Sequence, residues 1–152
     1  MTRAVQLRRA VAADATAVTT VVHSAFEEYV RRIGRPPFPM QVDYAAAIAE
    51  HEVWVTLDGE TTTGCLVLHL EADHLLIEVL AVPPTLQGKG IGTRLLSVAD
   101  DRARELGLGE VRLYTNELMT ENLHYYPARG YGETGREQVG PFRRVLFSKS
   151  LR

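Results

Sequence analysis

The sequence has few of the features that define disulfide scaffolds, metal proteins or membrane proteins. Cys65 is the only cysteine among 152 residues, which excludes a disulfide within the chain and a metal site built from cysteines. The five histidines show no metal-ligand spacing, so no metal is predicted. No apolar run is long enough to span a bilayer, and residues 1–18 lack the apolar core of a signal peptide. We therefore expect a cytoplasmic protein with no membrane partner.

Charge of one sign is also scarce. The net charge is −2 and no run of like charges occurs, which argues against nucleic acid as a partner. The length of 152 residues, with 45% hydrophobic and 24% charged residues, suits one soluble domain with one core. The sequence therefore predicts a single domain over residues 1–152.

Apolar periodicity predicts a mixed α/β (α+β) domain. The predicted strands are 5–9, 51–57, 62–71, 75–82, 111–116 and 143–151, and the predicted helices are 13–33, 42–50, 91–107 and 121–130. Asp14 is the predicted N-cap of the first helix. The run 75–82 is apolar on both faces, which favours a central, covered strand. We expect a mostly antiparallel central sheet flanked by helices on both faces.

The segment QGKGIG (87–92) lies between the predicted strand 75–82 and the predicted helix 91–107. Glycines let the backbone approach an anion closely, and a helix N-terminus offers free N–H groups and a positive dipole end. The P-loop pattern is excluded because no Ser or Thr follows Lys89, and the dinucleotide pattern is excluded because Thr93 occupies its third glycine position. From spacing alone, an anion site and a simple tight turn both remain open.

A longer stretch around this loop carries a more specific signal. LAVPPTLQGKGIGTRLL resembles the acetyl-CoA motif of the GNAT acetyltransferase superfamily at Val82, Pro84, Gln87, Gly90 and Gly92. The segment 114–133 is similar to the second motif of that superfamily, a strand and short helix with a Tyr before a Gly-aromatic ending. The N-terminal half matches only in the order of its elements. The resemblance implies an N-acetyltransferase that uses acetyl-CoA and an amine acceptor.

The resemblance also implies which residues bind the cofactor. In the superfamily, the backbone corresponding to Leu80, Ala81 and Val82 pairs with the pantetheine arm, and Asn122 and Tyr126 lie where the family contacts the distal arm. The loop that would hold the pyrophosphate comprises Gln87, Gly88, Lys89, Gly90, Ile91, Gly92 and Thr93. The side chain of Lys89 could add positive charge there or extend into solvent.

Two residues are candidates for proton transfer. Many members of the superfamily use a Tyr at the position of Tyr126 as general acid for the departing thiolate; the alternatives are a core role for Tyr126 and the same role for Tyr125. Glu78 interrupts the otherwise apolar run 75–82, where a carboxylate costs free energy unless it is paired or used. Some relatives use an acidic residue at this position as general base. A structural glutamate is the alternative reading.

The acceptor cannot be read from the sequence. Residues 26–40 correspond to the helices and loop that shape the acceptor pocket in the superfamily, and they contain charges of both signs. A small-molecule amine and a peptide or protein amine both remain open. Superfamily members often dimerise, so a homodimer is also an expectation. The competing functions are a non-catalytic acyl-CoA-binding domain on the same fold and a different nucleotide-binding α/β domain.

Overall fold

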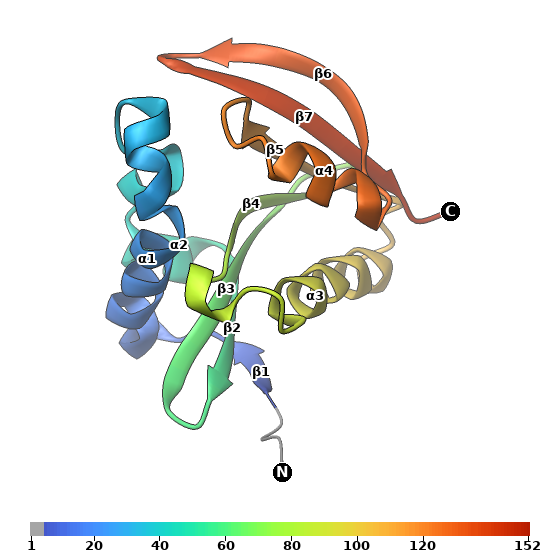
Figure 1. Cartoon of the computed structure of the whole chain (residues 1–152). Coiled ribbons are helices and arrows are strands. Elements are labelled where there is room, and N and C mark those ends of the chain that lie inside the picture. The colour runs from blue at the N-terminus through green and yellow to red at the C-terminus, as the bar shows by residue number, and fades with distance from the viewer. Residues whose placement is uncertain (1–4) are drawn as a thin grey trace.

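The computed structural model describes residues 5–152, so residues 1–4 of the predicted domain lie outside it. Within the described part, seven strands form one sheet in the order β1-β2-β3-β4-β5-β7-β6 (Figure 1). The strands are β1 (Gln6–Arg9), β2 (Glu52–Asp58), β3 (Thr61–Leu70), β4 (Leu75–Ala81), β5 (Glu110–Asn116), β6 (Gly132–Val139) and β7 (Phe142–Ser150). All neighbouring strands are antiparallel except β4 and β5, which are parallel.

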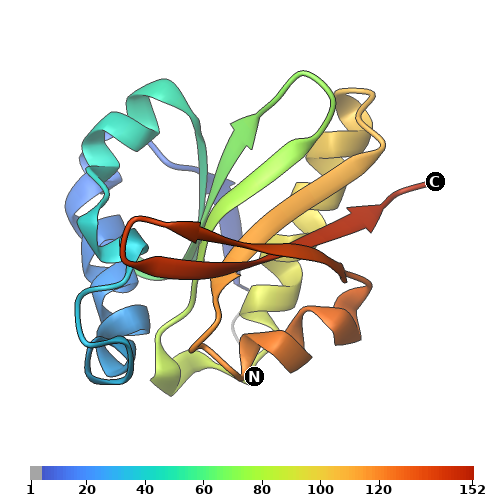
Figure 2. The same ribbon diagram turned by 90° about the horizontal axis from the view of Figure 1, so that it is seen from above.

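Four α-helices cover the two faces of this sheet in residues 5–152. They are α1 (Ala15–Ile33), α2 (Tyr44–Glu50), α3 (Ile91–Glu105) and α4 (Asn122–Tyr125). Figure 2 shows α1 and α2 on one side of the sheet and α3 and α4 on the other. No helix among the described residues is long and apolar enough to cross a membrane.

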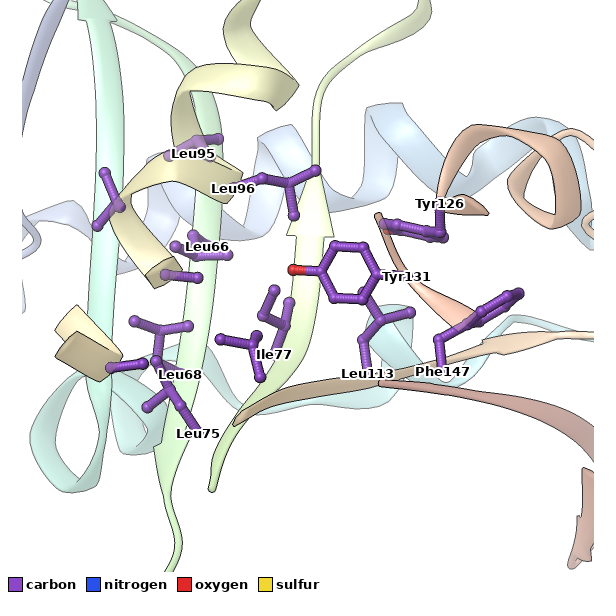
Figure 3. Close-up of a cluster of buried hydrophobic side chains, with 14 of the residues drawn as sticks. Leu66, Leu68, Leu75, Ile77, Leu95, Leu96, Leu113, Tyr126, Tyr131 and Phe147 are labelled. Carbon is purple, nitrogen blue, oxygen red and sulfur yellow. The ribbon is translucent and has the colours of Figure 1, made fainter. Parts of the chain in front are cut away.

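Each face of the sheet has its own apolar core. On the side of α1 and α2 the fully buried residues include Val18, Val22, Tyr44, Val55 and Val67. The core on the side of α3 and α4 is shown in Figure 3; it includes Leu66, Leu68, Leu75, Ile77, Leu95, Leu113, Tyr126, Tyr131 and Phe147. Alternation along β3 supplies both cores, because successive strand side chains point to opposite faces.

The predicted fold class is confirmed, and the run 75–82 is confirmed as a central strand because β4 lies between β3 and β5. The prediction of one strand after the last helix was wrong: β6 and β7 form a hairpin there. The reason is that β6, with the sequence GETGREQV, is an exposed edge strand with almost no apolar residues. Its backbone pairs with β7, and since neither of its faces is buried, its sequence has no hydrophobic alternation.

Two helix predictions also need correction. Asp14 occupies the N-cap position of α1, but its side chain makes no capping hydrogen bond to that helix. Instead its carboxylate accepts hydrogen bonds from the Val11 backbone N–H and the Arg8 guanidinium. The predicted helix 121–130 is two short pieces, α4 and a 3₁₀ turn over Pro127–Arg129, because Pro127 has no N–H to continue the α-helical ladder.

Candidate active site

A β-bulge in β4 sets the position of Glu78. Val67 of β3 pairs with Val79, but the next residue, Leu68, pairs with Ile77, so Glu78 has no partner in β3. An extra residue of this kind bends the strand and re-aims its side chains. The bulge also switches the faces of β4: Ile77 packs in the core beside α3, whereas Val79 packs in the core beside α1.

The same strand separates from β5 at the bulge. The parallel pairing joins Leu75–Ile77 only to Val111–Leu113, although β5 continues to Asn116 in its pairing with β7. Beyond Ile77, the edge of β4 that faces β5 therefore has no strand partner. An unpaired edge presents backbone N–H and C=O groups that an extended ligand can use.

Glu78 is held by a tyrosine from the neighbouring strand. The hydroxyl of Tyr114 donates a hydrogen bond of 2.5 Å to one carboxylate oxygen of Glu78. The other oxygen lies 4.0 Å from Nδ1 of His69, whose ring stacks on His51 at 3.8 Å between centroids. Burial lowers the pKa of His69, although Glu78 opposes that shift. Burial and the Glu78 carboxylate raise the pKa of Tyr114, which keeps the phenol protonated as a donor.

Glu78 lines the smaller of two adjoining cavities. This smaller cavity has a volume of about 60 Å³, and Tyr114 and Arg144 also line it. Its apolar walls are Phe26, Pro37, Phe38, Pro39, Met119 and Phe142. The segment 26–40 therefore does contribute a rigid apolar wall. The space admits only a few non-hydrogen atoms, so a ligand would place one end of itself there.

The glycine loop lines the larger cavity, which has a volume of about 790 Å³. Gly88 and Gly90 have positive φ angles of 81° and 83°, a conformation that side chains disfavour. The Gln87 side chain donates to the Val82 carbonyl and so ties the loop back to the end of β4. The loop ends at the first turn of α3, whose backbone N–H groups have no partner within the helix. This geometry suits an anionic group.

The two cavities meet at three residues. Both cavities are lined by Phe26, Leu80 and Asn122. Leu80 belongs to the unpaired end of β4, which therefore lies where the cavities meet. The side chain of Asn122 is fixed by a donated hydrogen bond of 2.9 Å to the Thr115 hydroxyl. The two cavities therefore share a wall.

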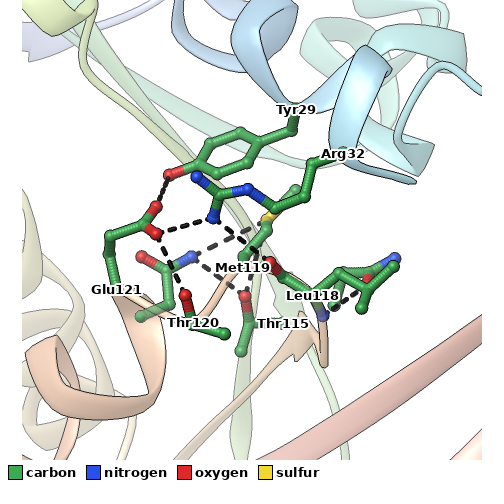
Figure 4. Close-up of polar contacts among 9 residues, drawn as sticks. Tyr29, Arg32, Thr115, Leu118, Met119, Thr120 and Glu121 are labelled. Carbon is green, nitrogen blue, oxygen red and sulfur yellow. Dashed lines mark hydrogen bonds and ion pairs between the residues drawn. The ribbon is translucent and has the colours of Figure 1, made fainter. Parts of the chain in front are cut away.

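A polar cluster joins α1 to the segment before α4 on the wall of the larger cavity (Figure 4). Glu121 accepts a hydrogen bond of 2.7 Å from the Tyr29 hydroxyl and pairs with the Arg32 guanidinium at 2.6 Å. Arg32 also donates to the Leu118 carbonyl. These donors lower the pKa of Glu121 to about 2. The cluster ties together two segments that are 86 to 92 residues apart.

Tyr125 and Tyr126 have different surroundings. Tyr125 lines the larger cavity, and its hydroxyl lies 2.7 Å from where a Cβ on Gly92 would be, so a side chain at Gly92 would collide with it. The Arg129 guanidinium stacks 3.6 Å over the Tyr125 ring. Tyr126 is only 7% exposed and packs against Tyr131 and Phe147. Burial raises the pKa of Tyr126, and its hydroxyl has no hydrogen-bond partner in residues 5–152.

Most of the predicted cofactor residues lie together. Those that line the larger cavity are Leu80, Val82, Gln87, Gly88, Gly90, Ile91, Gly92, Thr93 and Asn122. Three do not line it: Ala81 is buried beside α1, Lys89 is exposed, and Tyr126 lies in the core beside α3. Glu78 lies in the smaller cavity. Among residues 5–152 no group of histidine, cysteine, aspartate and glutamate side chains has a metal-binding arrangement.

Sequence reasoning missed several residues of the site. Tyr114, Arg129 and Arg144 line the cavities or hold their side chains, and Glu121 anchors the polar cluster. No motif marks them. The alternation of β5 was the one available signal, because a tyrosine in a strand beside the glutamate-bearing strand is a natural partner for a buried carboxylate.

A strand splayed at a bulge, a glycine loop at the start of the next helix and two adjoining cavities characterise this α/β fold. Residues 18–131 match the acetyltransferase (GNAT) family, and the chain belongs to this family.

Individual relatives agree with this assignment. A probable N-acetyltransferase 14 of Xenopus tropicalis is 28% identical over 104 residues, 66% of this chain and 50% of the relative. The acetyltransferase Atu2258 of Agrobacterium fabrum is 31% identical over 84 residues, 55% of this chain and 58% of the relative. The chain thus spans about half the length of these curated relatives.

Solved structures share the fold. The PaiA N-acetyltransferase of Thermoplasma acidophilum, crystallised with coenzyme A, superposes with a TM-score of 0.81 over 97% of this chain and 99% of its own. The sequence identity is 16%, so this likeness concerns the fold.

The polar cluster around Glu121 predicts a pH dependence of stability. The pKa of Glu121 is about 2 in the folded protein and near 4.3 in the unfolded chain. Its contribution to folding stability is therefore present above about pH 4.3 and is lost as the pH falls toward 2. Glu121→Gln should lower the free energy of unfolding at pH 6 by at most about 1 kcal/mol, since the carboxylate is half exposed and screened. The deficit should shrink as the pH approaches 2, as measured by urea unfolding.

Glu60 is a matched control, because it is exposed and makes no hydrogen bond or ion pair within residues 5–152. Glu60→Gln should follow the wild type at every pH. A Glu121→Gln deficit that does not change between pH 6 and pH 3 would contradict the role of the charge.

Proposed function

We propose that the chain is an N-acetyltransferase that moves an acetyl group from acetyl-CoA to a primary amine by direct attack in a ternary complex. The observation that carries the proposal is the meeting of the two cavities at Leu80 and Asn122. One cavity ends at a glycine loop suited to a pyrophosphate, and the other contains a carboxylate. A direct transfer needs both ligands at adjoining sites, and no enzyme nucleophile. Cys65 is fully buried, which fits this route.

The larger cavity fits a molecule such as acetyl-CoA in three ways. Its volume of about 790 Å³ is within the usual range for ligand sites. The loop residues 87–93 and the first turn of α3 offer backbone N–H groups to the two phosphates. Arg129 also lines this cavity and adds positive charge. The relation to a coenzyme A-bound PaiA of the same fold supports this assignment.

The residues proposed to bind this cofactor follow from that fit. The unpaired backbone of Leu80, Ala81 and Val82 would pair with the pantetheine amides, as an added strand pairs with a sheet edge. The amides of the loop would hold the pyrophosphate, with Lys89 contributing charge from the solvent side. Asn122 lies at the junction of the cavities, where the arm would pass.

Acetyl-CoA supplies an activated acyl group, and side chains of the protein carry out the proton transfers. An alkylammonium ion must lose a proton before its nitrogen can attack the carbonyl carbon. We assign the removal of this proton to Glu78, whose carboxylate is oriented by Tyr114. When the carbon–sulfur bond breaks, the sulfur receives a proton. We assign that step to Tyr126, the position that the family resemblance indicates; its phenol is protonated and makes no hydrogen bond within residues 5–152.

The loop assignment predicts that Gly90→Glu lowers acetyl-CoA affinity by at least about 100-fold. The substitution puts a negative charge beside the phosphates and a side chain at a positive φ of 83°. Isothermal titration calorimetry with acetyl-CoA measures the change, with ATP and NAD as comparison ligands. Gly107→Glu is the matched control, because Gly107 also has a positive φ, 74°, with open space, at the other end of α3. Normal acetyl-CoA binding by folded Gly90→Glu protein would refute the loop assignment.

The base assignment predicts that Glu78→Gln lowers kcat/KM by about 100-fold or more while acetyl-CoA affinity stays the same. Glutamine keeps the shape and can still accept the Tyr114 hydrogen bond, but it cannot take up a proton. Release of the coenzyme A thiol in the presence of amines is the measurement. The control is Glu71→Gln, because Glu71 is exposed and lies one residue past the end of β3. Unchanged turnover would mean that Glu78 is structural. Binding of acetyl-CoA without turnover of any amine by the wild type would favour a non-catalytic acyl-CoA-binding domain.

The two tyrosines can be separated by the same assay. Tyr126→Phe should lower kcat at least about tenfold with little change in acetyl-CoA affinity, because only the proton donor is lost. Tyr125→Phe should act mainly on acetyl-CoA affinity, because that hydroxyl faces the loop at Gly92. If Tyr125→Phe loses turnover and Tyr126→Phe does not, the general acid is Tyr125.

A further inference from the structure

Arg144 has an unusual position in the smaller cavity. It comes from β7, and its guanidinium lies 3.9 Å over the centre of the Tyr114 ring and 5.4 Å from that of Phe38. Two aromatic faces therefore hold the cation at the cavity wall. Tyr114 is the same residue whose hydroxyl binds Glu78. One side chain thus fixes both a carboxylate and a guanidinium in the smaller cavity.

The guanidinium of Arg144 has no counter-ion in the part of the chain that the structure describes. It makes no hydrogen bond and no ion pair within residues 5–152, although its neighbours on the same hairpin, Arg136 and Arg143, both pair with Glu117. Glu137 stands opposite Arg144 in the β6–β7 register but forms no ion pair with it. A partly buried fork of five N–H donors is thus available to an anion from outside the chain.

The other surfaces of the smaller cavity offer no competing charge. Apart from Glu78 and Arg144, its lining is apolar or carries only neutral polar groups, including Asn116 and Asn122. The charged residues of α1 lie elsewhere: Glu28 and Arg32 line the larger cavity, and Arg32 is paired with Glu121. A ligand in the smaller cavity therefore meets one negative and one positive group. Guanidinium is the side chain best matched to a carboxylate, because the two planar groups form paired hydrogen bonds.

We infer that the acceptor is a small molecule that carries a carboxylate close to its amine, as a free α-amino acid does. The ammonium group faces Glu78 and the carboxylate faces Arg144. The volume of about 60 Å³ suits the compact head of such a molecule. A lysine side chain or a protein N-terminus lacks the adjacent carboxylate and would leave Arg144 without a partner. This inference rests on the proposed acetyl transfer and specifies its acceptor.

The test compares acceptors with the same skeleton in the thiol-release assay. Glycine, L-alanine and L-leucine are each paired with the corresponding amide and with the amine that lacks the carboxyl group. We expect kcat/KM at least about tenfold higher for the acids, because a charge-assisted hydrogen bond contributes about that factor. Arg144→Gln should erase this preference by raising KM for the acids roughly 10- to 100-fold, with little change for the amides.

Two further variants guard against a purely structural effect. Arg143 is the neighbouring arginine; it is exposed and pairs with Glu117. The Arg143→Gln variant should therefore keep the preference for acids over amides. Arg144→Lys keeps the charge but not the fork and should restore part of it. If amines turn over without preference for the carboxylate, the inference is refuted while acetyl transfer stands.

A second readout does not depend on turnover. The Nε–H resonance of Arg144 is followed by NMR while N-acetylglycine or N-acetylglycinamide is added to protein with coenzyme A. A shift with the acid alone, absent in Arg144→Gln, supports the inference. No shift, or equal shifts with both compounds, overturns it even if none of the chosen amines reacts. Failure of acetyl-CoA binding in calorimetry would instead contradict the proposed function.

Discussion

The separation of β4 from β5 is the constraint on which the rest of the site depends. Parallel pairing is lost after Ile77, one residue before the bulge at Glu78. An unpaired strand edge inside a sheet leaves backbone polar groups that need partners. Two cavities lie beside this edge: the glycine loop and α4 line the larger one, and the loop between α1 and α2 lines the smaller one. The bulge also takes the Glu78 carboxylate out of the β3 ladder and places it at the wall of the smaller cavity instead of in the core.

Residues from distant parts of the chain stabilise this gap. The cluster of Tyr29, Arg32 and Glu121 joins α1 to the segment before α4 across the larger cavity. On the other side, Tyr114 links Glu78 to Arg144 by a hydrogen bond at its hydroxyl and a cation–π contact at its ring. Each contact has a modest energy by itself. Together they fix the positions of charged groups that solvent would otherwise screen, and such fixed charges are what proton transfer and substrate recognition require.

The two tyrosines at the end of α4 illustrate how local sequence and packing divide roles. Adjacent residues on a helical turn point about 100° apart, so Tyr125 and Tyr126 have different surroundings. Tyr125 lines the larger cavity, with its ring covered by Arg129, while Tyr126 packs among Tyr131 and Phe147. The family resemblance had favoured Tyr126 for chemistry. Its unpartnered hydroxyl keeps that assignment as a proposal, and the hydroxyl of Tyr125 over Gly92 explains why no side chain fits at that glycine.

The sequence by itself determined the elements whose signal is local. Apolar periodicity gave most of the helices and strands, the position of β4 in the sheet follows from its two apolar faces, and QGKGIG marked the loop before α3. What it did not determine were features that depend on contacts between distant residues. The strand β6 has no apolar pattern because it is an exposed edge strand, and Asp14 pairs with Arg8 instead of capping α1. The partners of Glu78, the free guanidinium of Arg144 and the meeting of the two cavities were decided only by tertiary structure, since they arise where strands and helices far apart in the chain come together.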